Sequence, residues 1–450
     1  MDCLCCRTSN VIASRRRSNP FLIVKRFISH FSSHFTHFTF LIALTACSEF
    51  FEPVDSTPAP TEYSYNYWLL QRTYLFEDEL PLLDENGDSV QELYSKLSDP
   101  FTRYVLPSKS EATITQINTS VVPGDVGLEC YLISERQYPV VIYRVYPNGP
   151  AGLAGVPKYG NILNVNGTEI TGPRAQDLYD SVLRYSKDIS MRVAFLDDTT
   201  LYEMSKEDVY APTVFLDTAA GNIPVITITG FKLTTADQKN GTLGELKTYL
   251  DSTRNTTEPR LIDLRNNPGG HVKHCIAMAD LFIKSGVVSS RTWRIFSGDG
   301  SPVRKSFSEM ATPGHSGEDK KFVLLVNKNT ASCAEIFAAA LQEGADIPIA
   351  GQTTYGKGIG QSTWKTMSGG LAIITNLEFL TPKGNSYNKK GLQPDYPCEN
   401  ASLLCGLEAV QKYYGKSSLE KSRDTLFAEE YAVLRRTNDI GGAFMRGDDN

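Results

Sequence analysis

The spacing of apolar positions changes along this chain of 450 residues. Between residues 62 and 117, apolar residues recur at helical spacing in "YNYWLLQRTYLFEDEL" and "SVQELYSKLSDPFTRYVLPSKSEA". Turn dipeptides interrupt these stretches at Asn86-Gly87 and Asp99-Pro100. The pattern predicts a small helical region.

Two further patterns follow. Residues 118–205 contain short strand-like runs, "VGLECYL", "YPVVIYRVY", "NILNVNG" and "MRVAFL", with one amphipathic helix, "RAQDLYDSVLRY". Residues 206–415 alternate apolar strands with amphipathic helices, which predicts an α/β layer with mainly parallel pairing. Catalytic loops in such sheets lie at the carboxyl ends of strands, where "RNNPGG" follows "LIDL" and "NTAS" follows "FVLLV".

The amino-terminal segment resembles a targeting sequence. Basic residues precede the short apolar run "FTFLIALTAC", as in a secretory signal peptide, and the run is too short for a convincing membrane span. Residues 44–47, "LTAC", resemble a bacterial lipobox, in which Cys47 would carry the lipid. The alternative is a plain signal peptide. We therefore expect residues 1–47 to be a signal peptide with lipobox, 48–61 a Pro-rich tether, and 416–450 a polar tail.

Composition narrows the choice of partners and compartment. A formal net charge of −6, with 21% charged residues, gives no general attraction to nucleic acid. Cys398 and Cys405 are close enough in sequence for a disulfide in an oxidising compartment, whereas Cys130, Cys275 and Cys333 are expected to be single buried thiols.

The segment "GQTTYGKG", residues 351–358, comes within one side chain of a phosphate-binding P-loop. A P-loop needs Ser or Thr where Gly358 stands, with a helix beginning there. The following "IGQSTWKTMSGGLAIITNLEF" instead predicts strand and turn. Lys357 therefore needs another explanation.

Residues 118–205 resemble a PDZ domain. The resemblance is carried by "VYPNGPAGLAGVPKYGNILNVNGTEI", with its Gly-Pro-Ala turn, Ala-Gly step and strand ending in Asn-Gly. In such domains a φ-Gly-φ loop offers N–H groups to a peptide's terminal carboxylate while the peptide adds a strand. Val126, Gly127 and Leu128 match that loop in position, although the glycine alone could merely make a turn.

The segment "NKNTASCAEIFAAALQEGADIPIAGQTTYGKGIGQ" resembles the C-terminal processing serine peptidases, or tail-specific proteases. "DPFTRYV", "DLRNNPGG" and "TPKGNSYNKKGLQPDY" extend the resemblance over most of the chain. It implies Ser332 as nucleophile, Lys357 as base and Gln361 as the residue that orients the lysine. The fold implied is an α/β protease core (mixed sheet with helices, strand-to-helix nucleophile junction) over residues 206–415, plus a PDZ domain and a small N-terminal helical region over 62–117.

The chemistry of these residue types agrees with the resemblance. A serine at a strand-to-helix junction lies at a helix amino terminus, where unpaired N–H groups favour developing negative charge. Lysine can act as a base only when neutral, so burial must lower its pKa. We expect the oxyanion to be bound by the backbone N–H of Cys333 and by that of Gly269 or Gly270.

Several alternatives accompany this interpretation. Ser332 could be a helix cap, and Cys333 could be a nucleophile, although no partner residue has matching context. His271 and His274 lack the further ligands of a zinc site and are expected to be surface or second-layer residues. No metal or cofactor is implied.

The sequence thus predicts a serine endopeptidase that captures protein or peptide substrates with a free C-terminus. It would be anchored by an N-terminal lipid in a bacterial cell envelope, facing the periplasm or the exterior. The alternative is a catalytically inactive PDZ adaptor on a protease fold.

Overall fold

A computed structural model describes residues 61–415 apart from 83, 85, 86, 88, 220–222 and 298–300. The expected signal peptide, Cys47, most of the tether and the polar tail lie outside the described residues. In the part of the chain that the structure describes, no helix has the length and apolar character to cross a membrane.

Residues 61–118 form mostly helices. The elements are α2 (Glu62–Thr73), η1 (Glu77–Glu79), α3 (Val90–Ser95), β1 (Arg103–Val105) and α4 (Pro107–Asn118). Leu70 of α2 and Leu93 of α3 pack with Ala372 and Ile374 of a distant strand. The helices thus bury their apolar sides against that strand. The pairing of β1 with the same strand also joins this region to the rest of the fold.

Residues 121–210 form a mostly β unit. Its elements are β2 (Val121–Asp125), β3 (Leu128–Leu132), β4 (Val140–Val145), α5 (Pro150–Leu153), β5 (Asn161–Val165), β6 (Thr168–Glu169), α6 (Ala175–Tyr185), β7 (Asp188–Phe195), β8 (Asp198–Ser205) and β9 (Glu207–Tyr210). One sheet has the order β3-β4-β5-β7-β8 with β6 on β5, while β2 pairs with β9. The predicted helix is α6, and Tyr179 packs from it onto Ile142 and Ile162 of the sheet.

The core of residues 214–414 is a six-stranded sheet in the order β10-β11-β12-β15-β16-β19. The strands are β10 (Val214–Ala219), β11 (Ile223–Ile228), β12 (Arg260–Asp263), β15 (Phe322–Val326), β16 (Ile349–Gly351) and β19 (Tyr396–Pro397). All neighbours from β11 to β19 are parallel and only β10 is antiparallel, so the prediction of mainly parallel pairing is confirmed.

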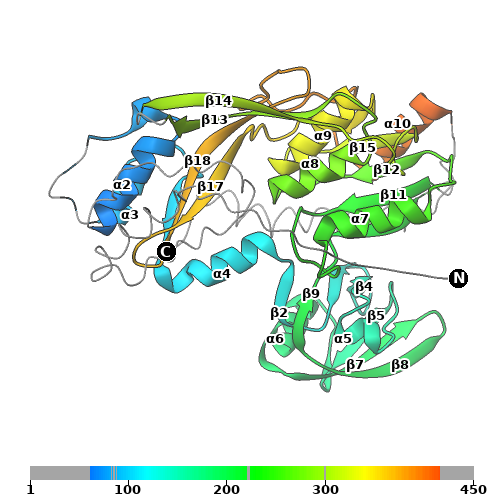
Figure 1. Cartoon of the computed structure of the whole chain (residues 1–450). Helices are drawn as coiled ribbons and strands as arrows, with labels where there is room; N and C mark the ends of the chain where they lie inside the picture. Colours follow the sequence, from blue (N-terminus) through cyan, green and yellow to red (C-terminus); the bar gives the residue numbers. More distant parts are fainter. Residues whose placement is uncertain are drawn as a thin grey trace, which may run out of the picture. The chain divides into compact units, whose positions relative to one another are not determined.

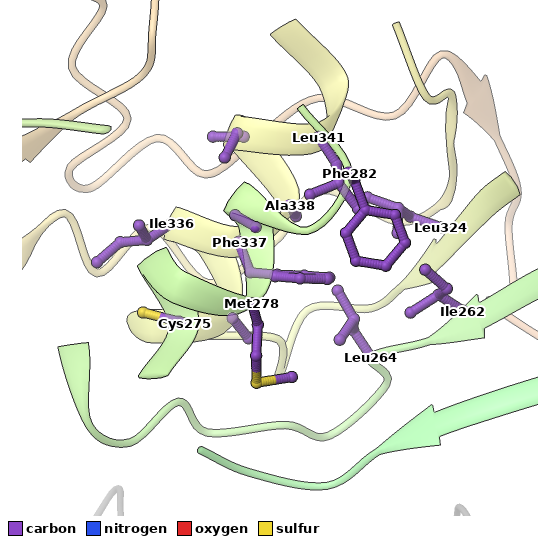
Figure 2. Close-up of a cluster of buried hydrophobic side chains, with 14 of the residues drawn as sticks. Ile262, Leu264, Cys275, Met278, Phe282, Leu324, Ile336, Phe337, Ala338 and Leu341 are labelled. Atoms are coloured by element: carbon purple, nitrogen blue, oxygen red, sulfur yellow. The ribbon is translucent and has the colours of Figure 1, made fainter. Parts of the chain in front are cut away.

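Helices cover both faces of this sheet, which explains the fully buried run "FVLLV" of β15. The helices are α7 (Gly241–Ser252), α8 (Val272–Asp280), α9 (Cys333–Gly344) and α10 (Leu403–Tyr414). Successive strand residues point to opposite faces, so Leu324 packs with α8 and α9 while Leu325 packs with α10. Figure 2 shows Phe282 and Phe337 against Ile262 and Leu324 on the first face.

A second sheet, in the order β1-β18-β13-β14 with β17 on β18, joins distant parts of the sequence. It consists of β1, the hairpin β13 (Val287–Phe296) and β14 (Pro302–Met310), and the hairpin β17 (Ile359–Lys365) and β18 (Leu371–Leu380) (Figure 1). The strands after "GKG" confirm the prediction of strand and turn there. The β13–β14 hairpin was not predicted from the sequence.

Candidate active site

Ser332 lies at the junction between β15 and α9, at the carboxyl edge of the parallel sheet. Its φ is 57° and its ψ is −120°, a conformation that is uncommon for a residue other than glycine. Thr330 supports the turn because its hydroxyl donates to the carbonyl of Leu264 at 2.9 Å. A half-buried serine on a strained strand-to-helix turn is the arrangement that exposes a nucleophilic hydroxyl.

Lys357 lies in the loop between β16 and β17, and 6% of its surface is exposed. The flanking glycines are required for close packing. A Cβ on Gly356 would lie 2.8 Å from the backbone nitrogen of Gly391, and one on Gly358 would lie 2.9 Å from that of Asn388. The loop therefore brings the lysine into the protein interior and leads into a strand, not into the helix that a P-loop requires.

One buried carboxylate connects the two loops. Oε2 of Glu335 accepts hydrogen bonds from the backbone N–H of Ser332 at 2.9 Å and of Lys357 at 2.8 Å. Oε1 accepts from the Thr354 hydroxyl at 2.5 Å and from the N–H of Gly356 at 2.7 Å. Burial raises the pKa of Glu335, but four donors converging on an acceptor-only group fit the ionised form.

An aromatic ring and charged side chains of both signs influence the amine of Lys357. Its Nζ lies 4.0 Å from the ring centre of Phe101, in the loop between α3 and β1. Burial lowers the pKa of Lys357 from its ordinary 10.5 to about 8. The charge of Arg103 lowers this pKa further, while Asp99 and Glu335 raise it. Asp99, Phe101 and Arg103 belong to "DPFTRYV", which entered the sequence analysis only through its resemblance. The structure places this segment beside Lys357.

Two backbone N–H groups near Ser332 could bind an oxyanion. Cys333 is the first residue of α9, so its N–H has no acceptor within the helix. Gly269 fits tightly against it: a Cβ there would lie 2.8 Å from the Cys333 nitrogen and 2.9 Å from the Ser332 Cβ. The N–H of Gly269 itself donates to Oδ1 of Asn267 at 2.9 Å. The choice between Gly269 and Gly270 as second donor stays a prediction.

Cys333 forms a disulfide with Cys275 of α8, with the two Cα atoms 5.7 Å apart. The prediction that both were single thiols is therefore wrong, because α8 and α9 pack side by side and bring together residues separated by 58 positions. The same bond removes the thiol from Cys333, so it cannot be the nucleophile in this form. The sequence left a disulfide between Cys398 and Cys405 open, and the structure has one. Among the described residues, Cys130 is not in a disulfide, and its thiol donates to the Tyr179 hydroxyl at 3.6 Å.

One part of the chain matches a known family. Residues 222–398 match the model of a family described as peptidase family S41. This part of the chain is therefore similar to peptidase family S41. It includes Ser332, Lys357, Glu335 and both glycines described above.

Known proteins are similar to this chain over more than two thirds of its length. The C-terminal processing peptidase, chloroplastic, of Tetradesmus obliquus is 26% identical over 390 residues, covering 82% of this chain and 80% of its own length. The carboxy-terminal processing protease CtpA of Bacillus subtilis is 27% identical over 316 residues, covering 69% of this chain and 63% of its own. A solved structure of a candidate S41 protease from Bacteroides fragilis shares the fold, with a TM-score of 0.52, 12% identity and coverage of 84% and 97%.

Gln361 lies on β17 of the S41-like domain, four residues after Lys357. Its Nε2 donates to the hydroxyl of Thr375 at 2.9 Å, and the N–H of Thr375 donates to the hydroxyl of Thr102 at 2.9 Å. Thr102 is adjacent to Phe101, so one network ties Gln361 to the loop that covers Lys357. The orientation of Lys357 by the amide oxygen of Gln361 stays a prediction.

His271 is buried directly after Gly270, and His274 is half-buried. Burial, with the nearby charges of His274 and Lys273, lowers the pKa of His271 to about 4, so it is neutral at pH 7. Within the described ranges, no group of three or more His, Cys, Asp or Glu side chains is arranged to hold a metal ion.

Val126 and Gly127 connect β2 to β3 in the mostly β unit, and Leu128 is the first residue of β3. Gly127 has a φ of 79°, and a Cβ on it would lie 3.2 Å from the Cα of Gly149. The structure differs from the expectation of open donors here, because the N–H of Gly127 donates to Oδ1 of Asp125 at 2.5 Å.

Proposed function

We propose that the protein is a serine endopeptidase in which Ser332 is the nucleophile and Lys357 the general base. The observation that carries this proposal is the shared carboxylate of Glu335, which binds the backbone N–H groups of both residues through one oxygen atom. The S41 match, and the buried position of Lys357 beneath Phe101, support it.

The reaction follows from these groups. The neutral amine of Lys357 removes the proton of the Ser332 hydroxyl as its oxygen attacks the substrate carbonyl. The N–H groups of Cys333 and of Gly269 or Gly270 stabilise the resulting oxyanion. The Lys357 ammonium then gives its proton to the leaving amine, and an acyl-enzyme forms. Water, activated by the same amine, hydrolyses the acyl-enzyme and restores Ser332.

We further propose that residues 118–205 are a PDZ domain that holds an extended segment of the substrate. The sheet order, with β3 at one end and α6 packed on the sheet, suits the addition of a peptide strand beside β3. Lipid attachment at Cys47 and residence in a bacterial envelope are also proposals. Two disulfides in the described residues support an oxidising compartment.

The direct test is cleavage of an unstructured peptide with an apolar carboxyl end by the purified full chain. Ser332→Ala and Lys357→Ala should each lower kcat by on the order of 10³-fold or more. Lys357→Arg should be equally inactive because a guanidinium does not deprotonate. Peptide binding should persist in all three variants. Full activity of Ser332→Ala would refute the assignment, and peptide binding without cleavage by the unmodified chain would favour the adaptor alternative.

A further inference from the structure

The φ-Gly-φ loop of the proposed PDZ domain already binds a carboxylate, and that carboxylate belongs to this chain. The N–H of Gly127 donates to Oδ1 of Asp125 at 2.5 Å. The backbone N–H groups of Leu128 and Val126 act to lower the pKa of the same carboxyl. The glycine N–H that the sequence assigned to a peptide terminus is therefore engaged by one half-buried side chain.

The loop around Asp125 is held firmly. The carbonyl of Gly127 accepts from the N–H of Tyr146 at 2.9 Å, and that of Val126 accepts from Ala151 at 2.8 Å. Gly127 also packs closely against Gly149. Because these contacts fix both sides of the turn, the N–H of Gly127 cannot easily turn away from Asp125 toward another acceptor.

The charges near Asp125 do not favour a second anion. Burial raises the pKa of its carboxyl, while the hydrogen bonds from the loop and the charge of Lys206 lower it. Lys206 donates its own ammonium to the carbonyl of Leu183 on α6 at 2.7 Å. From β3, Glu129 adds another carboxylate, which accepts from the Tyr146 hydroxyl at 2.8 Å and is paired with Arg144. A peptide carboxylate in this loop would therefore compete with Asp125 for the N–H of Gly127 and meet its negative charge.

The open side of β3 remains suited to a peptide. In the described sheet, β3 is an end strand paired with β4 alone. Its partly buried Leu128, Cys130 and Leu132 share a core with Leu178 and Val182 of α6. Main-chain pairing along such an edge needs no terminal carboxylate.

We propose that Asp125 determines the specificity of this domain by occupying the carboxylate position itself. The ligands selected are extended peptide segments without a negative charge at that position, including internal segments of a polypeptide, in preference to free C-terminal carboxylates. This inference rests on the proposed peptide-binding role of residues 118–205, and it changes the expectation from the sequence that a free carboxyl end is captured.

The test measures binding in the full chain carrying Ser332→Ala, so that no cleavage occurs. The probes are one fluorescein-labelled peptide ending in Leu-Ala-Ala, prepared with a free carboxylate and as the carboxamide, and titrated by fluorescence anisotropy at pH 7.5. We expect the carboxamide to bind at least about tenfold more tightly. Asp125→Gly should reverse the preference, because it frees the N–H of Gly127 for the peptide carboxylate and removes a negative charge from the loop. Asp125→Asn should weaken the preference by removing the charge alone.

Asp208→Asn is the matched control, because its carboxylate accepts the N–H of Gly124 on the same turn at 3.0 Å but takes no hydrogen bond from the loop. It should leave the carboxamide-to-acid ratio unchanged. Tighter binding of the free acid by the parent, or an Asp125→Gly variant with the parent's ratio, would overturn the inference. Absence of binding by every variant would overturn the peptide-binding role and this inference together, while cleavage by the unmodified chain would still test Ser332 and Lys357 separately.

Discussion

The pKa of Lys357 sets the pH dependence of the proposed reaction, and its value can be worked from the structure. The shift from 10.5 to about 8 corresponds to roughly 3 kcal/mol of differential stabilisation of the neutral amine. At pH 7 about one molecule in ten then carries a neutral lysine, compared with about one in 3,000 for an unperturbed side chain. We therefore expect kcat/KM to rise with pH and to reach half its maximum near pH 8.

Arg103→Gln is the informative perturbation. Arg103 lowers the pKa of Lys357 through its positive charge, so removing the charge should move the half-maximal pH upward. The guanidinium is exposed and screened by salt, so we expect a shift of less than about one pH unit. Activity at pH 7 should fall up to about tenfold while the alkaline plateau stays unchanged.

The assay is initial-rate hydrolysis between pH 6 and 10 of a peptide with blocked ends and no Lys, Tyr or Cys. Arg103→Lys keeps the charge and is the matched control, which should retain the profile of the unmodified protein. Salt at about 1 M should shift the unmodified protein in the same direction as Arg103→Gln and have little effect on the variant. A half-maximal pH near 6.5 would indicate a histidine, and a downward shift in Arg103→Gln would refute the electrostatic reasoning.

Three other predictions concern stability and geometry. Lys357→Met should raise the free energy of unfolding at pH 7 by up to about 3 kcal/mol, because the depressed pKa means that the charged lysine destabilises the fold below pH 8. This gain in stability should fade as the pH rises from 8 to 10.5. Urea titrations at several pH values would measure it. Glu335→Gln should cost about 2–4 kcal/mol in the same measurement and abolish cleavage, since an amide cannot accept from four donors. The double variant Cys275→Ala and Cys333→Ala should lose about 2–4 kcal/mol of its free energy of unfolding. Its kcat should fall while KM stays constant, because the disulfide joins the two helices that follow the proposed oxyanion loops. Removal of the other disulfide is the control, and an unchanged kcat in both would limit the first bond to a stabilising role.

The sequence predicted the parallel sheet because the information lies in local patterns. "LIDL" and "FVLLV" are short, continuous apolar runs followed by turn residues, and these became β12 and β15. The pairing of Ser332 with Lys357 came from a family resemblance, since nothing in local spacing requires residues on separate loops to meet. Glu335 was visible in the same motif, but its four hydrogen bonds depend on the β16–β17 loop folding over α9.

The remaining features depend on contacts between distant residues. Cys275 and Cys333 are 58 positions apart, and only the packing of α8 on α9 brings them together. Phe101 belongs to the helical region yet covers Lys357 of the S41-like domain. Asp125 could have been noticed, because a side chain two residues before a glycine N–H often turns back to accept from it. The resemblance to a carboxylate-binding loop directed attention to the glycine and away from its neighbour.

The support of the Lys357 loop has a consequence for biosynthesis. Thr354, which donates to Glu335, accepts in turn from the N–H of Leu392, and Gly356 and Gly358 pack against the backbone of residues 388–391. The base therefore acquires its buried position only after the ribosome has made the chain beyond residue 392 and that segment has folded back. A nascent or truncated chain that ends earlier has the serine but not the supported lysine. In the proposed mechanism, such a chain would not yet have its general base.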